Sequence, residues 1–191
     1  MNKGRLEAFS DGVIAIIITI MVLELKVPPH ANLAALRHLF PVFLSYVLSF
    51  IYLGIYWNNH HHLFQAVRHV NGKILWANLH LLFWLSLIPF VIAWTGENNF
   101  APLPVVFYGI VLLCSAIAYS ILTIVLVARH GKDSALATAL GRDLKGKISI
   151  VIYALAIPLA LLNRWIACLL YVLVAVMWFI PDRRIERTLN S

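Results

Sequence analysis

Long uninterrupted apolar blocks constrain the fold of this chain more than any other feature of its sequence. Several blocks approach the roughly 20 residues that an α-helix needs to cross a bilayer. The 191 residues are 62% hydrophobic and only 12% charged, whereas a soluble domain carries about 25% charged residues. Because a helix satisfies its own backbone hydrogen bonds in lipid, the sequence predicts an all-α integral membrane protein.

The apolar blocks and the turn residues between them predict six membrane-spanning helices. The predicted spans are residues 9–25, 39–59, 74–95, 103–128, 148–162 and 165–180. Pro89 lies inside the third span and is expected to kink it. The sequence shows neither an internal repeat nor a second domain. Residues 1–191 are therefore predicted to form a single six-span domain.

The positions of lysine and arginine predict the orientation of the spans. With the N-terminus in the cytoplasm, twelve of the 15 basic residues fall inside and three fall outside. The inside set is Lys3, Arg5, Arg68, Lys73, Arg129, Lys132, Arg142, Lys145, Lys147, Arg183, Arg184 and Arg187, and the outside set is Lys26, Arg37 and Arg164. Cytoplasmic loops are enriched in basic residues, so both termini are predicted to be cytoplasmic in a multi-pass protein of the plasma membrane.

Charge and motifs exclude several classes of function. The net charge of +7 does not indicate a nucleic-acid partner, because the basic residues stand in loops beside the spans. The sequence contains no Walker loop, no His-Glu zinc pair and no Gly-x-Ser-x-Gly motif, so we expect neither an enzyme nor a bound cofactor. Cys114 and Cys168 lie inside predicted spans and are interpreted as small buried hydrophobes rather than as a disulfide.

The first predicted span has a polar entrance and then a bare apolar run. Arg5, Ser10 and Asp11 precede the run 13–23, which Thr19 alone interrupts. Two interpretations are open: an anchor with charged flanks, or a pore-lining helix whose polar end is fixed to its neighbours. Ser10 or Asp11 could cap the helix or bond to other helices. We do not expect a cleaved signal peptide, because no cleavage site follows the run.

A second polar group lies near the cytoplasmic ends of the second and third spans. Its members are Trp57, Asn58, His60, Asn78 and His80. The two asparagines and two histidines are expected to form a polar cluster at the depth of Ser10 and Asp11, and the tryptophan is expected in the headgroup region. Consecutive helical positions point about 100° apart, so the three histidines from His60 onward are not expected to bind one metal ion.

The motif Arg5-x-x-x-Phe9-Ser10-Asp11 at the start of the first span resembles the opening of the transmembrane protein 175 channels. These are potassium-permeable channels of endolysosomes and prokaryotes. The likeness continues at residues 12–16, at Thr19 and at residues 23–25, and it includes the Trp57…His60, Asn78…His80 and Pro89-Phe90 pairs. Spans four to six show only a general likeness to the family.

The resemblance implies a homotetramer in which the first helix of each six-helix subunit lines a central pore. A ring of bulky apolar side chains on this helix, rather than a backbone carbonyl filter, would then form the gate. The resemblance also implies that Arg5, Phe9, Ser10 and Asp11 hold the first helix against the second and third. The implied permeant ion is potassium, with modest selectivity over sodium and no cofactor.

Helical periodicity puts a set of first-span residues on one stripe: Gly12, Ile16, Thr19 or Ile20, and Leu23. If the stripe lines a pore, we expect Ile16 to form the tightest ring. Ser45 and Ser49 on the second span are expected to support the stripe from behind. Glu24 is expected either to concentrate cations at the outer mouth or to pair with Lys26 or Arg37. A secondary transporter and a non-conducting membrane scaffold remain the alternatives.

Overall fold

The protein is helical throughout the part of the chain that the structure describes. The computed structural model describes residues 2–28, 30–67, 69–131, 137 and 143–179. The helices are α1 (Lys3–Leu23), α2 (Leu33–Gln65), α3 (Gly72–Ser86), α4 (Ile88–Glu97), α5 (Pro102–His130), α7 (Leu144–Leu162) and α8 (Arg164–Phe179). The predicted all-α class is confirmed for these residues.

Five segments are long and apolar enough to cross a membrane. They are Lys3–Leu23, Leu39–Gln65, Gly72–Glu97, Pro102–His130 and Leu144–Leu162, and they correspond to the first five predicted spans. Helix α8 is apolar but has 16 residues, which is fewer than the roughly 20 that span a bilayer. Residue 180 of the sixth predicted span lies outside the described residues, so a sixth crossing stays a prediction.

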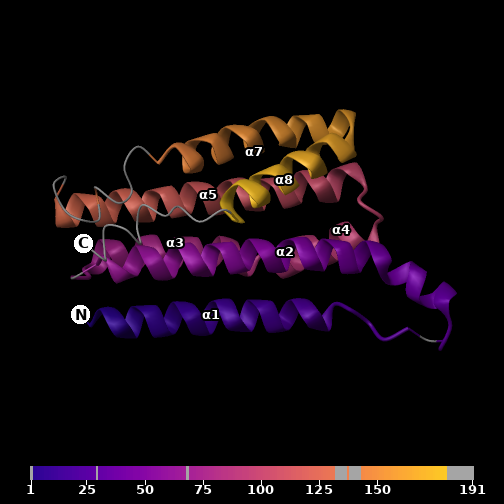
Figure 1. Ribbon diagram of the computed structural model, residues 1–191, viewed down its shortest axis with the longest axis horizontal. Helices are drawn as coiled ribbons and strands as arrows, with labels where there is room; N and C mark the ends of the chain where they lie inside the picture. Colours follow the sequence, from indigo (N-terminus) through magenta and orange to yellow (C-terminus); the bar gives the residue numbers. More distant parts are fainter. Residues whose placement is uncertain (1, 29, 68, 132–136, 138–142, 180–191) are drawn as a thin grey trace.

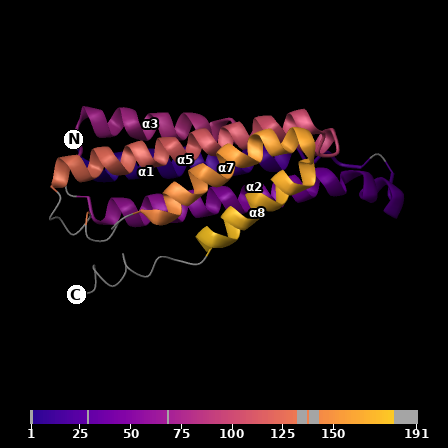
Figure 2. The same cartoon turned by 90° about the horizontal axis from the view of Figure 1, so that it is seen from above.

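The helices run back and forth along one long axis (Figures 1 and 2). Helix α1 lies along one side of the bundle, α7 lies along the opposite side, and α2 to α5 lie between them (Figure 1). Helix α1 packs against α2, α3 and α4, whereas α5 packs against α3 and α7. The first helix is therefore peripheral within the protomer and is covered on one face.

The helix ends alternate between the two ends of the bundle, which is the arrangement assumed in the predicted orientation. Helix α1 begins, α2 ends, α3 begins and α5 ends toward the same end of the bundle, at the left of Figure 1. The opposite end holds the α1–α2 and α7–α8 connections. Six basic residues of the predicted inside set lie outside the described residues: Arg68, Lys132, Arg142, Arg183, Arg184 and Arg187.

Helix α1 begins earlier than residue 9 because Asn2 caps it. The Asn2 side chain accepts a hydrogen bond from the Gly4 N–H at 3.0 Å, which satisfies one of the free donors at a helix start. Ser10 and Asp11 therefore lie about two turns inside the helix. The interpretation that either residue caps the N-terminus is wrong.

The second and third spans also differ in detail from their predicted bounds. Helix α2 starts at Leu33 because Asn32 accepts a hydrogen bond from the Ala35 N–H at 2.8 Å, and it continues to Gln65. The third span is divided between α3 and α4. Pro89 stands in the first turn of α4, where it has no N–H with which to continue the helix. The predicted interruption at Pro89 is confirmed.

The serines of α2 point away from α1. Ser45 Oγ donates to the carbonyl oxygens of Val42 and Ile92, at 2.9 and 3.3 Å, and Ser49 Oγ lies 3.0 Å from the hydroxyl of Tyr108 on α5. The expectation that these serines support the first helix from behind is therefore wrong. They join α2 to α4 and α5 instead.

Candidate functional site

Helix α1 has one buried face and one exposed face. The buried face consists of Leu6, Ser10, Ile14, Ile17 and Met21, each at most 4% exposed. The stripe predicted from periodicity lies on the opposite face, where Ile16 is 60% exposed and Leu23 is 75% exposed. Gly12, Thr19 and Ile20 are exposed on the same face. The protomer itself therefore leaves the whole predicted stripe uncovered.

A buried polar chain joins α1 to α2 and α3 near one end of the bundle. Ser10 Oγ donates to the carbonyl oxygen of Leu6 at 2.9 Å and accepts from Asn78 Nδ2 at 2.9 Å. Asn78 Oδ1 lies 2.8 Å from His60 Nε2. Because this amide oxygen can only accept, His60 donates through Nε2. All three side chains are at most 1% exposed, so their polar atoms depend on hydrogen bonds within the protein rather than on water.

A second contact joins the same end of α1 to α2. Trp57 Nε1 donates to Asp11 Oδ1 at 3.0 Å. Next to it, Gly4, Glu7, Ala8, Asp11, His60 and His61 line a hollow of about 290 Å³. The described residues contain no group of three His, Cys, Asp or Glu side chains that could hold a metal ion. The contact therefore positions α1 against α2.

The four residues of the opening motif divide between the two faces of α1. Ser10 and Asp11 bond to α3 and α2, as described above. Phe9 is 51% exposed and Arg5 is also exposed, both on the side of the Ile16 stripe. No hydrogen bond or ion pair joins the Arg5 side chain to any other described residue. Among the described residues, the side-chain hydrogen bonds from this motif to the second and third helices are those of Asp11 and Ser10.

Asn58 and His80 stand outside the polar chain. Asn58 is exposed, although its neighbours Trp57 and His60 are bonded to α1 and α3. His80 accepts a hydrogen bond from Trp84 Nε1, one turn along α3, at 3.0 Å. The predicted cluster thus forms around His60 and Asn78 and leaves these two residues at its edge.

A groove of about 680 Å³ runs between the exposed face of α1 and the exposed face of α4. Ile16, Ile20 and Glu24 line it from α1. Phe90 and Trp94 line it from α4, one turn apart, with ring centroids separated by 6.1 Å. Helix α4 was not predicted to contribute to this surface. The one available signal was the i, i+4 spacing of these two aromatic residues after Pro89.

An ion pair closes the other end of the α1 surface. Lys26 Nζ lies 2.7 Å from Glu97 Oε1 at the end of α4. Lys26 therefore pairs with Glu97 and not with Glu24, which leaves Glu24 in the groove. This pair ties the segment after α1 to α4. No local pattern in the sequence predicts it, because the partners are 71 residues apart.

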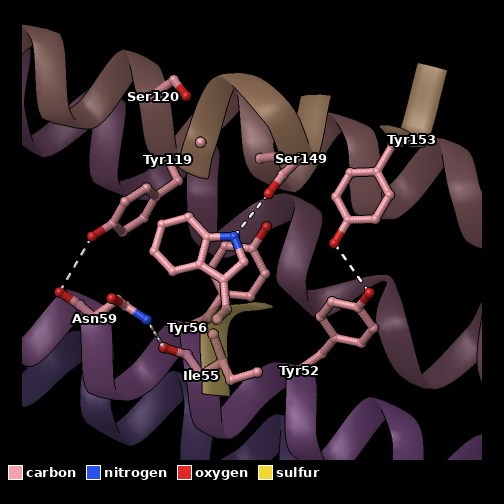
Figure 3. Close-up of a pocket in the computed structure, with 11 residues that line it drawn as sticks. Tyr52, Ile55, Tyr56, Asn59, Tyr119, Ser120, Ser149 and Tyr153 are labelled. Carbon is pink, nitrogen blue, oxygen red and sulfur yellow. Dashed lines mark hydrogen bonds between the residues drawn. The ribbon is translucent and has the colours of Figure 1, made fainter. Parts of the chain in front are cut away.

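A separate cavity lies among α2, α5, α7 and α8 (Figure 3). Its volume of about 30 Å³ is enough for one or two water molecules. Figure 3 shows the hydroxyl of Tyr153 directed at that of Tyr52. Tyr153 donates to Tyr52 at 3.1 Å, and Ser149 accepts from Trp178 Nε1 at 2.8 Å. The residues that line this cavity come from α2, α5, α7 and α8, so it is separate from the α1 surface.

The fold and the site define a multi-pass helical membrane protein in which one helix presents an uncovered apolar face. The family model described as the endosomal/lysosomal potassium channel TMEM175 matches residues 5–89. A potassium channel of Chryseobacterium sp. (strain P1-3) is 58% identical over all 191 residues, which is the whole of both chains. This chain belongs to the TMEM175 family of potassium channels.

Other relatives agree with this assignment. A potassium channel of Streptomyces collinus is 35% identical over 131 residues, 64% of each chain. The crystal structure of a lysosomal potassium-selective channel TMEM175 homologue from Chamaesiphon minutus matches with a TM-score of 0.80 at 28% identity, covering 94% of this chain and 97% of that one. The human endosomal/lysosomal proton channel TMEM175 is 34% identical over 116 residues, 54% of this chain and 23% of the human protein.

Proposed function

We propose that four copies of this protein form a potassium-permeable cation channel, modestly selective over sodium, in which α1 of each copy lines a central pore. The observation that carries the proposal is the apolar stripe of α1, which the protomer leaves exposed in a chain related over its full length to a potassium channel. Six spans, cytoplasmic termini and a plasma-membrane location complete the proposal.

The proposed gate is a hydrophobic constriction. Narrow apolar rings close a pore by excluding water, and a small rotation or splay of the lining helices reopens it. Ile16 forms the tightest ring, with Gly12, Ile20 and Leu23 as further layers. Thr19 adds a polar layer, because its hydroxyl donates to the carbonyl oxygen of Ala15 and keeps oxygen lone pairs for a partly dehydrated ion. Selectivity is modest since no fixed cage of oxygens replaces the hydration shell.

The polar contacts at the inner end of α1 have a different part in the proposal. The hydrogen bonds of Ser10 to Asn78 and of Asp11 to Trp57 hold α1 to its own subunit while the stripe faces the axis. Arg5 and Phe9 lie on the stripe side of α1, so in a tetramer they face the neighbouring copies. Asn58 and His80 are assigned only a supporting position beside this network.

Potassium flux into liposomes tests the gate assignment. Ile16→Asn places an amide in the proposed constriction, so we expect it to wet the pore and to raise basal potassium flux or lower selectivity over sodium. Ile124→Asn on α5 is the matched control, because Ile124 is 66% exposed and Ile16 is 60% exposed. If the two variants change flux equally, or if neither changes it, Ile16 is not the gate.

The same assay separates the channel from its alternatives. Because the human relative is named a proton channel, proton flux should be recorded beside potassium flux. A flux that saturates with substrate and follows a proton gradient would favour a secondary transporter. Absence of any cation flux from the wild-type protein would favour a non-conducting scaffold.

A further inference from the structure

We propose that the groove between α2 and α8 binds one phospholipid of the surrounding bilayer, with an acyl chain in the groove and a negatively charged headgroup at Arg164. The groove has a volume of about 680 Å³. It is separate from the α1 surface, and the proposal depends on the protein being embedded in a membrane and not on conduction.

The helices that form the groove join at one end and diverge toward the other. Tyr52 of α2 donates a hydrogen bond to the carbonyl oxygen of Tyr171 on α8, and both side chains are at most 2% exposed. From this junction the walls extend to Phe40 on α2 and Arg164 on α8. Figures 1 and 2 show α8 inclined to α2 rather than parallel with it. The result is a wedge-shaped space closed at its inner end.

The dimensions and chemistry of the groove fit an acyl chain. The α2 wall runs from Phe40 to Ile51, which is about 17 Å at 1.5 Å per residue. One leaflet of a bilayer has a hydrocarbon depth of about 15 Å, half of roughly 30 Å. Leu44, Leu48 and Val172 are among the apolar residues that line the space. In a bilayer such a space is filled by hydrocarbon, and its length corresponds to a single leaflet.

The open end of the groove carries an uncompensated positive charge. Arg164 lines the groove, and its guanidinium lies 5.3 Å from the ring centroid of Trp165. Among the described residues no carboxylate pairs with Arg164. Arginine binds phosphate oxygens through paired hydrogen bonds, and Arg and Trp are both favoured at the depth of lipid headgroups. The charge therefore selects an anionic phospholipid.

Native mass spectrometry of the purified protein in detergent, titrated with phosphatidylglycerol or phosphatidylcholine, tests the headgroup contact. The wild type is expected to retain one phosphatidylglycerol per protomer in preference to phosphatidylcholine. Arg164→Gln is expected to lower that preference about tenfold, since a charge-assisted hydrogen bond is worth about that factor. Arg37→Gln is the control, because Arg37 is a basic residue of the same predicted side that does not line the groove. Equal preferences in wild type and Arg164→Gln would overturn the proposal.

A second pair of variants tests the acyl-chain site. Val172→Trp fills the groove and is expected to lower retention of both lipids, whereas Val176→Trp, one turn further along α8 and outside the groove, is expected to leave it unchanged. Equal retention by the two variants would overturn the proposal. If Val172→Trp instead separates the oligomer while lipid retention is unchanged, the groove holds a second copy of the chain and the lipid assignment is wrong.

Discussion

Asn78 is the residue on which the attachment of α1 most depends. Its amide donates to Ser10 and accepts from His60, and it is fully buried. Asn78→Leu would remove the donor to Ser10 Oγ and leave the buried His60 Nε2 without its acceptor, which costs about 1–3 kcal/mol for a buried polar group. We expect a lower melting temperature for the purified protein in detergent. Asn58→Leu, at an exposed position of the same depth, is expected to have little effect, and equal losses in both variants would contradict the predicted role.

For the Lys26–Glu97 pair, we predict a contribution to stability that depends on pH. The hydrogen bond and the charge of Glu97 raise the pKa of Lys26 above its usual value of 10.5. Because the folded pKa is the higher one, the contribution of the pair to stability is present below pH 10.5 and is lost as pH rises through the raised pKa. The pair is exposed, so the effect on stability is small.

Amine titration followed by nuclear magnetic resonance in detergent measures this pKa directly. We expect the Lys26 amine in the wild type to titrate above 10.5, and Glu97→Gln to return its pKa toward 10.5. A Lys26 pKa that does not change in Glu97→Gln would show that the pair does not form in solution.

At the scale of the helices, the contact between α2 and α4 depends on a glycine. A Cβ atom at Gly96 would lie 2.6 Å from Val42 Cα and 2.7 Å from Ser45 Oγ. Gly96→Ala should therefore separate the two helices, with a loss of about 1–3 kcal/mol typical of overpacking. Unfolding of the purified protein at increasing concentrations of a denaturing detergent measures this loss of stability. Gly54→Ala is the control, because a Cβ at Gly54 meets nothing within 4 Å. An equal loss of stability in Gly54→Ala would contradict the close contact between α2 and Gly96.

The helices themselves were largely predictable, but their ends were not. Apolar length and periodicity are local properties, so the first five spans and the interruption at Pro89 follow from the sequence. The start of the first span was predicted too late, because the asparagine cap at Asn2 extends α1 through polar residues that hydropathy assigns to a loop. Helix α2 also begins earlier, at the cap Asn32, although its apolar span begins at Leu39 as predicted. The polar chain was predicted only in part, since helix rotation decides that Asn78 points to Ser10 while His80 points away.

At the scale of the whole molecule, the surface beside α1 is built from parts that are distant in the sequence. Phe90, Trp94 and Glu97 reach it because α4 packs beside α1. Sequence periodicity predicted the stripe from Ile16 to Leu23, because a stripe belongs to a single helix. It did not predict the α4 side of the groove or the Lys26–Glu97 pair, because both depend on how two separate helices are placed.

We propose that the exposed stripe of α1 lines the ion pathway, and thiol accessibility is a direct test of this placement. In a background with Cys114→Ala and Cys168→Ala, Leu23→Cys introduces a thiol on the stripe, and Leu162→Cys introduces one at the end of α7. The two leucines are 75% and 84% exposed in the protomer, and both belong to the predicted outer side. A positively charged thiol reagent added outside is expected to reduce the potassium flux of the Leu23→Cys variant. The flux of the Leu162→Cys variant is expected to stay unchanged. Equal sensitivity of the two variants, or block of Leu162→Cys alone, would contradict the claim.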